Sequence, residues 1–141
     1  MEASSRRIQV FFEGIEVATT VRSQRVLETS HPPVFYIPPE DVRMDLLRPG
    51  AGSSFCEYKG GARYYNLAVG AVSVANVAWY YPRPSPGFEV IRDHLAFYPG
   101  RVERCVVDGE VVRPQAGGFY GGWITDDVTG PFKGEPGTSG W

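Results

Sequence analysis

Short apolar runs separated by tight turns recur along this 141-residue chain, and that spacing limits the folds open to it. Two pairs of runs flank two-residue turns: residues 8–12 and 15–20 around Glu13-Gly14, and residues 104–107 and 110–113 around Asp108-Gly109. An Asp-Gly pair between β-branched runs is a strong hairpin signal, because both turn residues adopt positive φ. The 17 glycines and 12 prolines also exclude a helical bundle. The pattern predicts a mainly β protein built from antiparallel strands.

Further strands are predicted at residues 25–28, 34–37, 55–58, 62–69 and 72–81. In the last of these runs the alternation of apolar residues changes phase, because Val74 and Val77 have opposite parity. We therefore predict a bulge or a turn at Ala75-Asn76.

One short helix is predicted after Ile37. It would begin at Pro38-Pro39, where prolines are tolerated and Glu40-Asp41 favour the helix dipole, and end at Pro49-Gly50. A second helical turn is predicted at residues 87–92.

The charge balance and the uncharged stretches bear on partners and location. Fourteen basic and sixteen acidic residues give a net charge of −2, which disfavours binding by neutralisation of nucleic-acid phosphates. Residues 64–82 carry no charge, but Asn66 and Gly70 interrupt them, so two strands joined near Gly70 are favoured over a membrane span. The first seven residues form a short, polar segment that is basic at Arg6-Arg7, which predicts no signal peptide and a cytoplasmic location. We expect neither a nucleic-acid nor a membrane partner, and a monomer or a homodimer.

The two cysteines, Cys56 and Cys105, are predicted to be free thiols. They do not form a C-x-x-C pair, so the usual structural zinc site is absent from the sequence. A metal site that combines them with His31 and His94 has suitable ligand types but no supporting spacing. We therefore predict no metal and no cofactor.

The densest chemistry lies between residues 55 and 65, where Cys56 stands three residues before Lys59. If Gly60-Gly61 forms a tight turn or bulge, the lysine can approach the sulfur and activate it as a nucleophile. If the strand stays straight, the two side chains lie on opposite faces. Cys56 would then be a small buried apolar residue and Lys59 a surface cation with a buried stem. The sequence leaves both interpretations open.

An unusual number of aromatic residues falls in three of the predicted strands: Phe35, Tyr36, Tyr64, Tyr65, Trp79, Tyr80 and Tyr81. Aromatic side chains belong to the core by default. With tyrosine hydroxyls, Glu28 and Lys59 close by, they are also suited to line a pocket for a planar or anionic ligand.

The segment from residue 117 to residue 141 is rich in glycine and proline but also in aromatic residues, which disordered tails lack. We predict a single domain over residues 1–141, with a core at about 8–113 and an extension, residues 114–141, packed on it.

Four motifs occur in the order in which one bacterial family carries them. They are residues 28–42 around His31-Pro32-Pro33, Cys56-Glu57-Tyr58-Lys59-Gly60 with Tyr64-Tyr65, Trp79-Tyr80-Tyr81-Pro82, and Leu95-Ala96-Phe97-Tyr98. Together they resemble the signatures of the bacterial domain of unknown function 427 family, over roughly residues 8–113.

The resemblance implies a β-tent-like fold, in which two small antiparallel sheets meet at an angle with a cleft between them. Some proteins of that fold group hold zinc through C-x-x-C pairs, which this chain lacks. The family is sometimes labelled a nucleotidyltransferase, but no Gly-Ser with paired aspartates is present to bind two metal ions. The signature polar and aromatic positions of the family fall on Glu28, Tyr36, Asp41, Cys56, Lys59, Trp79 and Tyr81.

Three functions follow as hypotheses. The first is a small-molecule-binding module, with Tyr36, Trp79 and Tyr81 as apolar walls and with Lys59 paired to a ligand anion or to Glu28; Asp41 joins this ligand-binding set by the resemblance. The second is a thiol-dependent enzyme with Cys56 as catalytic nucleophile or redox centre and Lys59 as its activator. The third is a structural or interaction protein that acts through its aromatic C-terminal extension.

Overall fold

The computed structural model describes residues 1–28, 30–56, 58–116, 121–128, 130 and 132. Its strands are β1 (Glu2–Ser4), β2 (Ile8–Phe12), β3 (Ile15–Thr20), β4 (Ser23–Val26), β5 (Val34–Tyr36), β6 (Leu47–Cys56), β7 (Gly60–Val69), β8 (Val72–Tyr80), β9 (Ala96–Phe97), β10 (Arg104–Val107), β11 (Glu110–Val111), β12 (Arg113–Pro114) and β13 (Trp123–Ile124). Short 3₁₀ turns lie at η1 (Pro39–Asp41), η2 (Met44–Leu46), η3 (Glu89–Ile91) and η4 (Pro99–Arg101).

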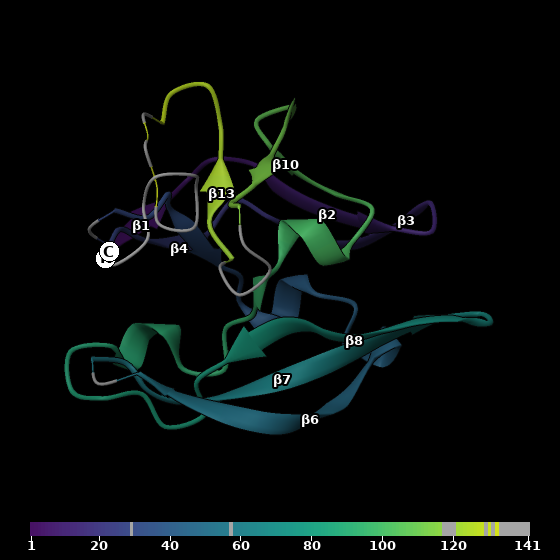
Figure 1. The fold of residues 1–141 in the computed structure, drawn as a ribbon, viewed down its shortest axis with the longest axis horizontal. Coiled ribbons are helices and arrows are strands. Elements are labelled where there is room, and N and C mark those ends of the chain that lie inside the picture. Colours follow the sequence, from purple (N-terminus) through teal and green to yellow (C-terminus); the bar gives the residue numbers. More distant parts are fainter. Residues whose placement is uncertain (29, 57, 117–120, 129, 131, 133–141) are drawn as a thin grey trace.

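The strands form small antiparallel sheets arranged in two layers (Figure 1). One layer is the four-stranded sheet β6-β7-β8-β9, which lies along the lower part of the view. The other layer combines the four-stranded sheet β11-β10-β2-β3 with the three-stranded sheet β1-β4-β5 and the pair β12-β13. The predicted mainly β, antiparallel fold is confirmed, although four small sheets replace the two that were expected.

Both predicted two-residue hairpins are present. Glu13 and Gly14 have φ of 50° and 75°, and Asp108 and Gly109 have φ of 48° and 84°, so each turn places two residues in the left-handed region that it requires. Gly70, with φ of 58°, lies in the turn between β7 and β8, as the interrupted uncharged stretch predicted. Among the residues that the structure describes, no helix has the length and apolar character needed to cross a bilayer.

The predicted irregularity in β8 is also confirmed. Tyr65 pairs with Ala78 and Leu67 pairs with Val74, so β8 carries two residues more than β7 over this interval. Asn76 adopts a φ of 52° there, and its backbone N–H donates to Asn66 Oδ1 at 2.9 Å. The bulge is therefore held by a side chain of the neighbouring strand.

The helix predicted after Ile37 is wrong. Only the 3₁₀ turns η1 and η2 form, because Val42 between them is extended and bridges to Ala18 of β3. The N–H of Arg43 donates to the carbonyl of Val17 at 2.7 Å, so long-range pairing replaces the helical hydrogen bonds. Pro49-Gly50 does not end a helix but lies in β6, an edge strand, where the missing N–H of proline is tolerated. The strand predicted at 55–58 ends at Cys56, whereas the turn predicted at 87–92 is present as η3.

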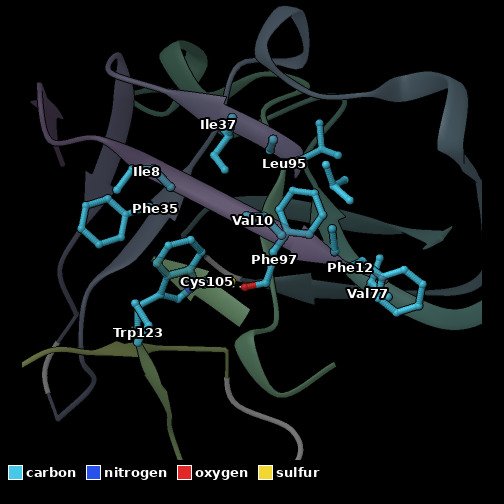
Figure 2. Packing of buried hydrophobic residues seen from close by; sticks show 14 of the residues in the cluster. Ile8, Val10, Phe12, Phe35, Ile37, Val77, Leu95, Phe97, Cys105 and Trp123 are labelled. Carbon is cyan, nitrogen blue, oxygen red and sulfur yellow. Dashed lines mark hydrogen bonds between the residues drawn. The ribbon is translucent and has the colours of Figure 1, made fainter. Parts of the chain in front are cut away.

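The main core lies between the two layers (Figure 2). It gathers buried side chains from both principal sheets and from the extension: Ile8, Val10, Phe12, Val17, Ala18, Phe35, Ile37, Leu47, Leu67, Val77, Ala78, Leu95, Phe97, Cys105, Val107, Val112 and Trp123. Trp123 is fully buried, its ring centroid is 5.3 Å from that of Phe35, and its Nε1–H donates to the carbonyl of Phe97 at 3.0 Å.

The extension is described in part. Trp123 belongs to β13, which pairs with β12, and Phe132 is also buried. Residues 117–120 and 133–141, which include Phe119, Tyr120 and Trp141 of the predicted aromatic extension, lie outside the described residues. The interaction hypothesis for this extension stays a prediction.

Candidate functional site

A second buried cluster, the pocket cluster, lies beside the main core. It consists of Val26, Tyr36, Ala62, Tyr81, Ile91 and Ala96, with Val34, Cys56, Trp79 and Phe88 packed against them. Seven of its ten members line a cavity of about 300 Å³. Of the residues predicted from sequence, this pocket brings together Glu28, Tyr36, Cys56, Lys59, Trp79 and Tyr81.

The turn between β6 and β7 places Lys59 beside Cys56. Cys56 pairs with Gly60, so the chain reverses between them and Lys59 does not continue a straight strand. Gly60 makes this possible with a φ of 107°, a value that residues with a Cβ rarely adopt. The carbonyl of Lys59 is fixed by the N–H of Ser85 at 2.9 Å. As a result, Lys59 Nζ lies 3.7 Å from Cys56 Sγ, within reach of a hydrogen bond to sulfur.

Lys59 also forms an ion pair with Glu28. Nζ and Oε1 are 2.5 Å apart, and the lysine side chain is 7% exposed whereas the glutamate side chain is 45% exposed. Lys59 is therefore not the surface cation of the straight-strand alternative, and Cys56 is only partly buried. A lysine ammonium has three N–H donors. Glu28 and Cys56 are the acceptors for Lys59 that the described residues provide.

Aromatic side chains form the other walls of the pocket. The Trp79 and Tyr36 rings meet edge to face, with centroids 6.2 Å apart and an interplanar angle of 90°, and Trp79 Nε1–H donates to the Tyr36 hydroxyl at 3.2 Å. The ring centroid of Tyr81 is 6.3 Å from that of Tyr36, and the ring centroid of Tyr98 is 4.6 Å from that of Trp79. The hydrogen bond and the ring contacts fix the orientation of these walls.

The pocket tyrosines are held in their neutral form. Burial raises the pKa of Tyr36 well above its usual value. Burial, followed by the nearby Cys56 and Glu28, raises the pKa of Tyr81. Burial raises the pKa of Tyr98 to about 12. At neutral pH their hydroxyls can therefore donate as well as accept hydrogen bonds.

Asp41, which the resemblance added to the predicted ligand-binding set, does not line this pocket. Its carboxylate accepts the Thr20 hydroxyl at 2.7 Å and the Arg22 Nε–H at 2.9 Å. The Arg22 guanidinium lowers the pKa of Asp41. In this arrangement Asp41 ties η1 to the end of β3.

Several pocket residues were not singled out as ligand-binding from the sequence. His31 and Gln115 line the pocket together, with His31 Nδ1 and Gln115 Nε2 at 3.2 Å. Gly121 closes another side, and a Cβ at this position would overlap the Trp79 ring. The Gly-Gly-Trp run at residues 121–123 is the local signal for such a close approach.

The four side chains considered for a metal site are spread over the molecule. Cys56 and His31 line the pocket, but Cys105 is fully buried in the main core, where burial raises its thiol pKa. The ring of His94 lies near its own turn, with Nδ1 3.0 Å from the carbonyl oxygen of Arg92. Within the described part of the chain, no group of three or more His, Cys, Asp or Glu side chains is placed to hold a metal ion.

Most of the residues that line the pocket lie in the part of the chain that matches a known protein family. The family model described as "Domain of unknown function (DUF427)" matches residues 1–108. Gln115, Gly121 and Gly122, which complete the pocket wall, lie beyond the matched part. No curated protein matches the chain.

Proposed function

The chain belongs to the domain of unknown function 427 family, and from this premise we propose that it is a small-molecule-binding module. One observation carries the proposal: a nearly buried ammonium and several aromatic side chains line the same cavity of about 300 Å³. A pocket of this kind suits a molecule with a planar part and a polar acceptor.

The composition of the walls supports binding over simple packing. Ligand pockets are mostly apolar, with a few placed polar groups, and have volumes from about 300 Å³ upward. Here Tyr36, Trp79 and Tyr81 supply flat apolar surface, whereas Lys59 and the tyrosine hydroxyls supply the polar groups.

Native mass spectrometry of the freshly purified full chain, compared with its denatured mass, tests the proposal. A mass excess that disappears on denaturation supports binding and gives the mass of the ligand. A thermal-shift screen of metabolites on the same protein tests binding when no ligand co-purifies.

A matched pair of variants separates binding in the pocket from binding elsewhere. Ala62 is buried on β7 and lines the pocket, whereas Ala68 on the same strand is exposed. We expect Ala62→Leu to remove the mass excess or the thermal shifts by filling the cavity, and Ala68→Leu to keep them. The proposal is overturned if no compound binds, or if both variants bind as the unmodified protein does.

A second candidate function, a thiol-dependent reaction at Cys56, is favoured by the 3.7 Å approach of Lys59 Nζ to Cys56 Sγ. A partly exposed thiol beside a cation is the setting in which reactive cysteines occur. We expect iodoacetamide to label Cys56 in the native protein at pH 7, and Lys59→Met to slow that labelling. A native Cys56 that resists the reagent would exclude this candidate.

A further inference from the structure

From the arrangement of Lys59 and Glu28 we infer that the pocket selects planar carboxylates. Lys59 is the anchor for the ligand carboxylate, and Glu28 is an internal anion that competes with the ligand for Lys59. This inference rests on the proposed binding function and names the ligand class for the same pocket.

The charge of the ligand follows from which member of the Lys59–Glu28 ion pair can move out of the pocket. Lys59 and Glu28 are the only Lys, Arg, Asp or Glu side chains of the described residues that line the pocket. The lysine is 7% exposed and its position is fixed by the β6–β7 turn, whereas the glutamate is 45% exposed. Glu28 can therefore move into solvent at small cost, but Lys59 would have to remain buried and must keep an anionic partner.

A ligand carboxylate satisfies this requirement and a ligand cation does not. When the carboxylate replaces Glu28 at Nζ, the buried ammonium stays paired and no charge is left alone in the interior. A cation drawn to Glu28 would instead lie beside the Lys59 ammonium and be repelled by it. The neutral hydroxyls of Tyr36 and Tyr81 add no charge that would favour a cation.

The preference for a planar ligand follows from the aromatic walls of the pocket. Trp79 is held edge to face against Tyr36 and is also in contact with Tyr98, so flat surfaces surround the anchor. A second cavity, of about 500 Å³, shares Lys59, Glu28 and His31 with the first and is bordered by Leu27, Tyr58 and Phe88. The ion pair therefore borders both cavities, and Leu27 and Phe88 give the second one apolar surface for a substituent of the ligand.

Calorimetric titration of the full chain with indole-3-carboxylate and with indole-3-carboxamide tests the inference, because the two probes share one ring and differ in charge. A hydrogen bond to a charged group corresponds to roughly tenfold or more in affinity. We expect the carboxylate to bind about tenfold more tightly than the amide at pH 7. Lys59→Met should abolish this preference, and Lys59→Arg, which keeps the positive charge, should retain part of it.

Glu28→Gln gives the sharper result, because removal of the competing anion should raise the affinity for the carboxylate several-fold. Glu40→Gln is the matched control, since Glu40 is 67% exposed and does not line the pocket. It should leave both affinities unchanged. If Lys59→Met does not fold, the Glu28→Gln and Glu40→Gln pair decides the question, and an unchanged carboxylate affinity in Glu28→Gln overturns the inference.

The remaining outcomes separate the inference from the proposed function. Equal binding of the two probes, blocked by Ala62→Leu, overturns carboxylate selection but supports a binding pocket. If neither probe binds while another compound binds in a manner that Ala62→Leu abolishes, the inference is again overturned and the function stands. If nothing binds, both are overturned.

Discussion

The main core and the pocket cluster share the same strands but are built on opposite principles. In the main core, aliphatic and phenylalanine side chains from both layers pack together with Trp123, whose indole N–H is satisfied by a backbone carbonyl (Figure 2). In the pocket cluster, aromatic side chains with polar atoms surround a cavity, and a buried ammonium is paired with a half-exposed carboxylate. The first arrangement is closely packed, and the second encloses a cavity lined by aromatic and charged side chains.

Single strands contribute to both clusters, which shows how closely the two are joined. On β5, Phe35 belongs to the main core and the next residue, Tyr36, belongs to the pocket cluster. On β8, Ala78 belongs to the main core and the next residue, Trp79, packs against the pocket cluster. The period of two in a strand therefore places adjacent residues in the main core and in the pocket cluster.

The comparison predicts that loss of Trp123 will have the largest effect on stability. Trp123 is 0% exposed, and Trp123→Ala removes a large core side chain and its hydrogen bond to Phe97. We expect the free energy of unfolding, measured in urea, to fall by about 3–5 kcal/mol. Truncation before residue 117 should prevent folding for the same reason.

Phe55→Ala provides the control, because Phe55 borders the pocket but is 76% exposed. It should change the free energy of unfolding by no more than about 0.5 kcal/mol. Similar losses in the two variants would show that the extension is not part of the main core.

Labelling of the two cysteines tests the main core and the pocket cluster in one experiment. Cys105 is fully buried in the main core, where burial raises its pKa, whereas Cys56 lines the pocket and is partly exposed. At pH 7 we expect iodoacetamide to label Cys56 in the native protein and to reach Cys105 only after unfolding in urea. Peptide mass spectrometry would distinguish the sites, and equal native labelling would contradict the contrast between a closed core and an open pocket.

The sequence predicted the parts of this contrast that depend on neighbouring residues. Asp108-Gly109 specifies its hairpin locally, and the change of parity between Val74 and Val77 indicated the bulge that Asn76 forms. The helix expected after Ile37 failed because Val42 pairs with Ala18, a contact that local propensity does not encode.

The same distinction holds for the candidate site. The spacing of Cys56, Lys59 and Gly60 indicated that a turn could bring thiol and ammonium together, and the structure contains that turn. The Gly-Gly-Trp run and the motif that ends at Tyr98 mark these segments, but that both pack on Trp79 depends on long-range contacts that local spacing does not encode.

A smaller effect is expected where the pocket cluster loses a polar group but keeps its shape. Tyr36→Phe removes the acceptor of the Trp79 indole N–H and leaves the ring in place. We expect a loss of about 1–2 kcal/mol in the free energy of unfolding, well below that of Trp123→Ala. Trp79→Phe removes the donor instead, and the double variant completes a double-mutant cycle. If the losses of the two single variants simply add in the double variant, the hydrogen bond does not contribute to stability.

Alkaline pH should weaken the fold through the buried tyrosines of the pocket as well as through the buried Cys105 thiol of the main core, because burial raises the pKa of these groups. The share of a single tyrosine, Tyr98, is a small one. The usual pKa of tyrosine is 10.0, and burial raises that of Tyr98 to about 12 in the folded protein. Between these values the folded state keeps a proton that the unfolded chain has lost, so the free energy of unfolding falls as the pH rises. Below pH 10 both states are protonated and Tyr98 contributes no pH dependence. Between pH 9 and pH 11, the free energy of unfolding measured in urea should therefore fall by about 1 kcal/mol less in Tyr98→Phe than in the unmodified protein. Tyr58→Phe, at a side chain that is 73% exposed, should lose as much as the unmodified protein. If the two variants respond alike to alkaline pH, Tyr98 does not contribute to that response.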